Sequence, residues 1–145
     1  MLATEEPRRV GGGDLHEWEA EGFMREALAE AAAAVEAGNH PFGAVLVLDG
    51  DVVLRGRNAV VTERDATRHA ELVLASEASR SLPREALARS TLVTSTAPCP
   101  MCAGGILNAR LGAVVWGAPN PLMGADGSWI RMMEDGVRED DEMLD

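Results

Sequence analysis

The chain has 145 residues, of which 46% are apolar, so it is long enough for one domain with a hydrophobic core. Its net charge of −11 disfavours a nucleic-acid substrate, because an acidic surface repels phosphate, although a local group of arginines could still hold a tRNA. Two cysteines are too few for a disulfide scaffold, and no apolar run reaches the length of a membrane span. We therefore expect a cytoplasmic protein that does not enter a membrane.

The N-terminal tail and the single domain are separated by composition. Residues 1–13 combine charged side chains with the run Gly11-Gly12-Gly13, so we expect a disordered tail there. Nothing in 14–145 reads as a linker or an internal repeat, which predicts one domain over that range.

Hydrophobic periodicity and turn signals predict the order of helices and strands. In chain order the predicted elements are a helix at 15–37, strands at 43–48 and 52–57 joined by an Asp49-Gly50 turn, a loop at 58–66, a helix at 67–80, a short helix at 85–88, a strand at 91–95, a helix from 98 to 109 or 110, a strand at 113–117 and a short helix at 129–134. The hairpin supplies an antiparallel pair, and the later strand–helix–strand crossovers favour parallel pairing. The order therefore predicts an α/β fold, with three α/β/α layers around a mixed sheet.

His69, Cys99 and Cys102 form the strongest chemical signal in the sequence. Each motif lies at the start of a predicted helix, where free N–H groups and the helix dipole favour the thiolates that zinc requires. Three protein ligands leave a fourth tetrahedral position for water, as in catalytic rather than structural sites. We therefore predict that these residues bind Zn²⁺. His16 and His40 could close the site instead, but His40 precedes a proline in an extended segment and is poorly placed.

Glu71 lies two residues after His69, where it can serve as a proton shuttle. A site with two thiolates and one imidazole is less electrophilic than an all-histidine site, so a nearby base would help it to activate water. Residues at i and i+2 of a helix point in different directions, which makes Glu71 a poor ligand and directs its carboxylate to the substrate.

Each motif taken alone has other interpretations. C-x-x-C also occurs in redox centres and structural zinc sites, and His-x-Glu also occurs on solvated helix faces. Together and in this order, the residues match the H-x-E and P-C-x-x-C signature of zinc-dependent deaminases. A thioredoxin-like site is disfavoured, because its C-x-x-C would lie near the first strand of the chain.

Three stretches of the chain resemble the cytidine-deaminase-like superfamily, in the branch that holds guanine deaminases, fungal-type cytosine deaminases and bacterial tRNA adenosine deaminases. These stretches are His40–Val47, Asp65–Leu72 and Pro98–Gly104. The resemblance implies a sheet of about five strands, a homodimer, the zinc ligands and proton shuttle named above, and replacement of an exocyclic amine by oxygen.

The same resemblance implies three substrate contacts. Asn58 matches an asparagine that hydrogen-bonds the substrate ring or ribose, and its alternative role is that of a turn residue. Phe42 matches a position that lines the pocket, and its alternative role is in the core. The backbone N–H of Ala70 is implied to meet the attacked edge of the ring.

The motifs conflict about the substrate. His40–Gly43 resembles the free-base deaminases, whereas Leu107–Arg110 and Gly117–Pro121 resemble the tRNA adenosine deaminases. Ala97 stands where many relatives carry Glu, which weakens an assignment to either group. The late residues that could close over a base are Trp129, Glu134, Asp135, Asp140 and Asp141.

The charge of the chain decides the prediction about the substrate. Three arginines are expected near the mouth of the site, namely Arg64, Arg68 and Arg110. Three cations are few for binding a polyanion such as tRNA. The main prediction is therefore hydrolytic deamination of a small-molecule substrate, a free nucleobase, a nucleoside or a related heterocycle, with release of ammonia. The alternatives are a tRNA-specific adenosine deaminase and, in another class, a non-catalytic zinc-binding dimer.

Overall fold

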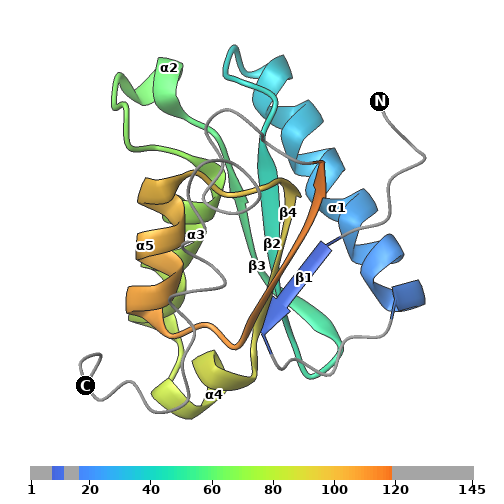
Figure 1. Cartoon of the computed structure of the whole chain (residues 1–145). Helices are drawn as coiled ribbons and strands as arrows, with labels where there is room; N and C mark the ends of the chain where they lie inside the picture. Colours follow the sequence, from blue (N-terminus) through green and yellow to red (C-terminus); the bar gives the residue numbers. More distant parts are fainter. Residues whose placement is uncertain (1–7, 12–16, 119–145) are drawn as a thin grey trace.

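The computed structural model describes residues 8–11 and 17–118. The elements are β1 (Arg8–Gly11), α1 (Glu17–Glu36), β2 (Gly43–Leu48), β3 (Asp51–Arg57), α2 (Val60–Glu63), α3 (Ala70–Ser81), α4 (Arg84–Arg89), β4 (Thr91–Thr96), α5 (Pro100–Ala109) and β5 (Ala113–Ala118) (Figure 1). The predicted helix at 129–134 and the late residues that could close the pocket lie outside the described residues. None of the described helices is both long enough and apolar enough to cross a membrane.

The strands form one mixed sheet in the order β1-β5-β4-β2-β3. β2 pairs antiparallel with both β3 and β4, and β4 pairs parallel with β5 through the crossover helix α5. β3 and β4 therefore run in the same direction on either side of β2, so their carboxyl ends lie at the same edge of the sheet. The predicted α/β fold with a mixed sheet is confirmed.

The hairpin turn between β2 and β3 follows from two residues. Asp49 and Gly50 both have positive φ angles, 51° and 86°. A two-residue turn with both residues in this region twists in the same sense as the strands it joins, and Asp-Gly suits it. The sequence signal for this hairpin is confirmed.

Helices cover both faces of the sheet (Figure 1). α1 packs on one face through a small cluster that includes Met24, Val45 and Val93. α3 and α5 pack on the other face through a larger cluster that includes Leu46, Leu92 and other buried residues. Because neighbouring residues of β2 and β4 alternate between the two clusters, these central strands are buried on both sides. The predicted three layers are present.

Two predicted boundaries near the site are wrong. α3 begins at Ala70, three residues later than predicted, because the Asp65 side chain accepts hydrogen bonds from the Thr67 N–H and hydroxyl at 2.9 and 2.6 Å and closes a local turn. The predicted loop at 58–66 contains the short helix α2, capped from outside by Asn39, whose Oδ1 accepts from two backbone N–H groups of α2. Neither the turn at Asp65 nor the helix α2 shows a periodic pattern of hydrophobic residues, so neither could be recognised from the sequence.

The prediction of a disordered tail is wrong for Arg8–Gly11, which forms β1 at the edge of the sheet, antiparallel to β5. Strand pairing uses backbone N–H and C=O groups, and β5 offers an unpaired edge, so even a charged, glycine-containing segment can add to it. The remainder of the predicted tail, 1–7 and 12–13, lies outside the part of the chain that the structure describes.

Candidate metal centre

The two cysteines lie where β4 passes into α5. β4 ends at Thr96, Cys99 is the N-cap of α5 with an extended backbone, and Pro100 opens the helix. Proline suits this position, because its fixed φ is helical and the first helical N–H has no partner in any case. Cys102 falls in the first turn and is buried, whereas Cys99 is partly exposed. The helix start thus presents two sulfurs at the end of a central strand.

His69 reaches the same point from α3. It is the N-cap of that helix, with an extended backbone at φ −77° and ψ 147°. Its Nδ1 lies 3.4 Å from the Cys99 Sγ and 3.6 Å from the Cys102 Sγ. One ligand atom from each of these three residues lies within 4.8 Å of the others, and no fourth residue of the described chain joins the group. The structure therefore brings together all three predicted ligands.

The spacing of these atoms fits zinc. With zinc–sulfur bonds of about 2.3 Å and zinc–nitrogen bonds of about 2.05 Å, tetrahedral geometry separates N and S by roughly 3.5 Å. The two His69–cysteine distances, 3.4 and 3.6 Å, lie on either side of this value. The ring nitrogen that faces the sulfurs is Nδ1, a detail that the spacing of the motif leaves undefined.

The electrostatics of the cysteine pair also suit a cation. The Cys102 thiol donates to Cys99, and His69 adds a favourable charge, so the pKa of Cys99 falls to about 5. The same shared proton, together with burial, raises the pKa of Cys102. Without metal the pair thus holds one thiolate near neutral pH, and a divalent cation would displace the second proton. Zinc is the cofactor that this donor set and the family both indicate.

Glu71 lies in the first turn of α3 with only 6% of its surface exposed. Burial, and to a smaller extent the nearby Cys99 thiolate, raise the pKa of this carboxyl to about 7 against opposing hydrogen bonds. A carboxyl that titrates near neutral pH can both accept and donate a proton, as an acid–base catalyst must. The residue is outside the ligand group, as expected for a shuttle.

The structure also describes the three residues predicted to contact the substrate, Asn58, Phe42 and Ala70. Asn58 directly follows β3, is 2% exposed, and its Oδ1 accepts from the Val60 N–H at 3.1 Å. Its backbone N–H donates to the Phe42 carbonyl at 3.0 Å. The Phe42 side chain is 36% exposed, so it is not a core residue. Ala70 is the first residue of α3, where the helix offers its N–H no partner.

Alanine at position 97, where many relatives carry Glu, does not displace the ligand residues. Ala97 is 3% exposed, packs in the cluster beneath α3 and α5, and donates its backbone N–H to the Ala118 carbonyl at 2.8 Å. Its small side chain is therefore part of the core behind the site.

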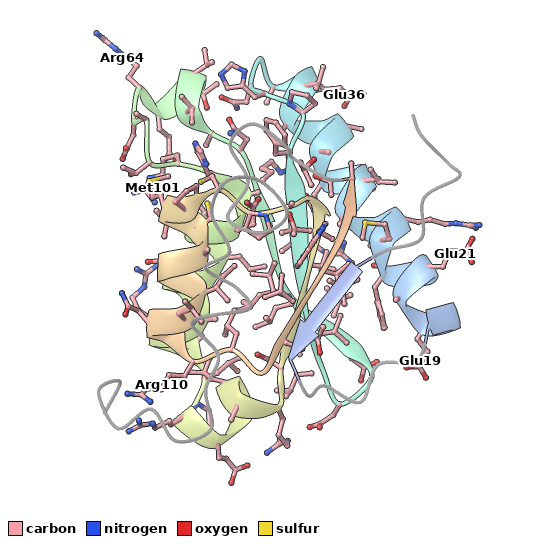
Figure 2. All side chains as sticks on the ribbon, in the orientation of Figure 1. Glu19, Glu21, Glu36, Arg64, Met101 and Arg110 are labelled. Atoms are coloured by element: carbon pink, nitrogen blue, oxygen red, sulfur yellow. The ribbon has the colours of Figure 1, made fainter. Side chains whose placement is uncertain are left out.

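The arginines expected near the mouth are distributed differently. Arg110 is the C-cap of α5, at the opposite end of that helix from Cys99, so its predicted place near the mouth is wrong (Figure 2). Arg68 forms ion pairs with Glu63 and Asp65 at 3.5 and 3.4 Å. Arg64 extends outward beyond α2 and has no ion pair among the described residues (Figure 2).

One residue of the centre is absent from the sequence prediction. Thr94, in the middle of β4, is fully buried, and its hydroxyl helps to hold the pKa of the Glu71 carboxyl down against the effect of burial. A hydroxyl within a buried central strand is the signal that could have identified it, since such groups need a partner.

Residues 17–118 match the family described as the cytidine and deoxycytidylate deaminase zinc-binding region. Among curated proteins, the chain is 54% identical over 114 residues to the chloroplastic tRNA(adenine(34)) deaminase of Arabidopsis thaliana, covering 79% of this chain but 9% of that protein. It is 38% identical over 113 residues to the tRNA-specific adenosine deaminase of Bacillus subtilis, covering 78% of this chain and 70% of that one.

Two solved structures are similar in fold. One comes from a study of A-to-I editing by tRNA:A34 deaminases at the wobble position of transfer RNA, with a TM-score of 0.69, 37% identity and coverage of 79% of this chain and 88% of the other. The second is guanine deaminase from Bacillus subtilis, with a TM-score of 0.63, 42% identity and coverage of 68% and 64%.

Proposed function

The chain belongs to the family of the cytidine and deoxycytidylate deaminase zinc-binding region, and from this premise we propose that it converts adenosine to inosine in tRNA. It is a zinc-dependent deaminase, as its homologues are. The observation that carries the tRNA substrate is the identity of more than half of 114 aligned residues with a tRNA(adenine(34)) deaminase. Because the alignment spans a small part of that longer protein, the substrate is proposed for this domain alone.

The ligand residues and Glu71 divide the chemistry between them. When held by His69, Cys99 and Cys102, zinc supplies a Lewis acid that activates water for attack on the ring carbon bearing the amine. Glu71 accepts a proton as the water oxygen bonds to that carbon and donates it to the amine, which leaves as ammonia. Oxygen replaces nitrogen on the ring, and no oxidant or reductant is required.

Asn58 is proposed to hold the substrate ring or ribose. Its Oδ1 is already bonded to the Val60 N–H, which fixes the side chain and leaves its amide NH₂ as the donor for a ligand. Phe42 is partly exposed, and its carbonyl accepts a hydrogen bond from the Asn58 N–H. We propose that the Phe42 side chain and the Ala70 N–H contact the base. These three contacts, like the homodimer and the cytoplasmic location, stay predictions.

Asn58→Asp tests this contact, because aspartate keeps the acceptor for the Val60 N–H and removes the amide donor. We expect kcat/KM to fall by about 10–100-fold, the cost of leaving a buried substrate acceptor without its donor. Asn39→Asp is the matched control, since Asn39 also caps α2 through its Oδ1 but is only partly buried. A fall of equal size in both variants would show that added charge, rather than a lost substrate contact, is responsible.

The acidic charge of the chain argues less strongly against tRNA than its total suggests. Residues 119–145 carry eight acidic residues and two arginines, which is −6 of the net −11. The segment that matches the family is therefore much closer to neutral than the whole chain. The relatives thus favour the tRNA alternative over deamination of a free base.

Guanine deamination is the second candidate. Its support is the fold and the 42% identity shared with the Bacillus subtilis guanine deaminase, together with the His40–Gly43 motif. In this alternative the reaction and the roles of zinc and Glu71 are the same, and the substrate is a free base.

A substrate panel separates the two candidates. Zinc-loaded protein is incubated with an anticodon stem-loop carrying adenosine at the wobble position, with the same stem-loop carrying guanosine there, and with guanine, cytosine and adenine. We expect inosine in the first RNA only, detected by mass spectrometry after nuclease digestion, and a rate that falls steeply with salt. Ammonia from guanine with an unchanged stem-loop would overturn the tRNA proposal and leave the second candidate.

A further inference from the structure

The four residues before the metal ligand His69 form a compact turn. The Asp65 Oδ1 accepts from the Thr67 N–H at 2.9 Å and from the Thr67 hydroxyl at 2.6 Å. The Asp65 carbonyl accepts from the Arg68 N–H at 3.1 Å, and the Thr67 carbonyl accepts from the His69 N–H at 2.9 Å. The side chain of Asp65 thus closes a turn that ends at the metal ligand.

The start of α3 depends on this turn, because His69 does not cap the helix with its side chain. His69 is the N-cap residue, a position whose side chain commonly accepts from a free N–H of the first helical turn. Its side chain forms no such bond, and its Nδ1 faces Cys99 and Cys102 instead. The position of the His69 backbone is therefore set by the segment before it.

The turn is also bonded to the chain that follows β3. The Arg68 carbonyl, which belongs to the peptide bond before His69, accepts from the Ala59 N–H at 3.0 Å. At the other end of the turn, the Asp65 N–H donates to the Val60 carbonyl at 3.1 Å. Rotation of the backbone within 66–68 would break the first of these bonds and would move the imidazole relative to the two sulfurs of the metal centre.

The Asp65 carboxylate has a second contact, an ion pair, that is too exposed to hold the ligand. Its Oδ2 lies 3.4 Å from the Arg68 Nε, and a Glu63 oxygen lies 3.5 Å from the same nitrogen. These three side chains are 39–54% exposed, and ion pairs between exposed side chains contribute little to stability. The two bonds from Thr67 to Oδ1 are the ones that constrain the backbone.

We propose that Asp65 is a positioning residue of the metal centre, because its side chain closes the turn that sets the place of the His69 ring. The Nδ1 of that ring lies 3.4 and 3.6 Å from the sulfurs of Cys99 and Cys102, the separation that tetrahedral zinc requires. Removal of a group that orients a ligand typically costs about 10–100-fold in metal affinity. The inference rests on the proposed function, since the zinc ion concerned is the one that this function uses.

Asp65→Ala removes the acceptor, whereas Asp65→Asn keeps an amide oxygen for Thr67 and removes only the charge. We expect zinc affinity to fall by about 10-fold in Asp65→Ala, because the side chain acts through the backbone, and to stay near wild type in Asp65→Asn. Glu63→Ala is the matched control, since it removes the other carboxylate beside Arg68 and leaves the turn intact. Competition with a chromogenic chelator measures the three affinities.

A second readout depends neither on affinity nor on turnover. With Co²⁺ in place of zinc, the visible absorption bands report the arrangement of the ligands around the ion. At full metal occupancy these bands should change in Asp65→Ala and keep their wild-type form in Asp65→Asn and Glu63→Ala. If Asp65→Ala does not fold, Thr67→Val compared with Thr67→Ser tests the same turn through the loss and return of the hydroxyl donor.

The outcomes separate this inference from the proposed function. Wild-type zinc affinity and unchanged cobalt bands in Asp65→Ala would overturn the role of Asp65 while the function stands. An equal loss in Asp65→Asn or Glu63→Ala would also overturn it, because the charge beside Arg68, rather than the turn, would then be responsible. If zinc-loaded wild type forms no inosine, the proposed function fails, and the chelator and cobalt measurements alone decide whether Asp65 positions His69.

Discussion

Replacing Glu71 with Gln is expected to lower kcat for deamination by about 10²–10⁴-fold, the range that a positioned acid–base group contributes. The amide has nearly the shape of the carboxylate and cannot exchange the proton that the amine requires. Glu71 is outside the group of ligand atoms, so the variant should still bind one zinc ion per chain. Single-turnover kinetics with metal analysis measures both quantities on the same sample.

Glu77→Gln is the matched control for this prediction. Glu77 lies on the same helix, α3, but is exposed and pairs with Arg80 at 2.6 Å, so its loss should leave kcat unchanged. Full activity in Glu71→Gln would remove the proton shuttle from the mechanism. Loss of zinc in the same variant would instead place the carboxylate among the ligands.

Replacing Cys102 with Ser is expected to abolish both zinc binding and deamination. Zinc prefers a thiolate to a hydroxyl that stays protonated at neutral pH, and Cys102 is one of the three ligand residues found in the described part of the chain. The loss of affinity should exceed the roughly 10–100-fold cost of removing a group that merely supports a ligand. Competition with a chromogenic chelator measures the affinity, and elemental analysis measures the zinc content.

Met101→Ser is the control for the cysteine variant. Met101 lies between the two cysteines in the same helical turn, but its side chain is 36% exposed and is not part of the ligand group (Figure 2). Its replacement should leave zinc affinity unchanged. Wild-type affinity in Cys102→Ser would mean that the metal is held elsewhere.

The ligand set could be predicted from the sequence because its chemistry is local. His69 and Cys99 are helix N-caps and Cys102 lies in the first turn of α5, and the thiolate preference of such positions holds whatever the rest of the fold does. The ring nitrogen that faces the sulfurs could not be predicted, because it depends on how α3 and α5 pack against each other. The hairpin at Asp49-Gly50 was also predictable, since its turn geometry is set by two residues.

The missed features depend on contacts between distant segments. β1 at Arg8–Gly11 exists through the backbone edge of β5, and α2 is capped by Asn39 from more than 20 residues away. Charge summed over the chain favoured a free-base substrate, whereas the relatives favour tRNA, because much of the negative charge lies after the matched segment. Such features can be recognised only when the three-dimensional structure is known.

The most direct test of the zinc-dependent deaminase proposed here is deamination in ¹⁸O-labelled water. Zinc-loaded protein and an anticodon stem-loop with a wobble adenosine should give inosine carrying one ¹⁸O on the ring, with one ammonia released for each inosine formed. Removal of zinc with a chelator should stop the reaction, and added zinc should restore it. Unchanged adenosine in the presence of zinc-saturated, folded protein would contradict the account.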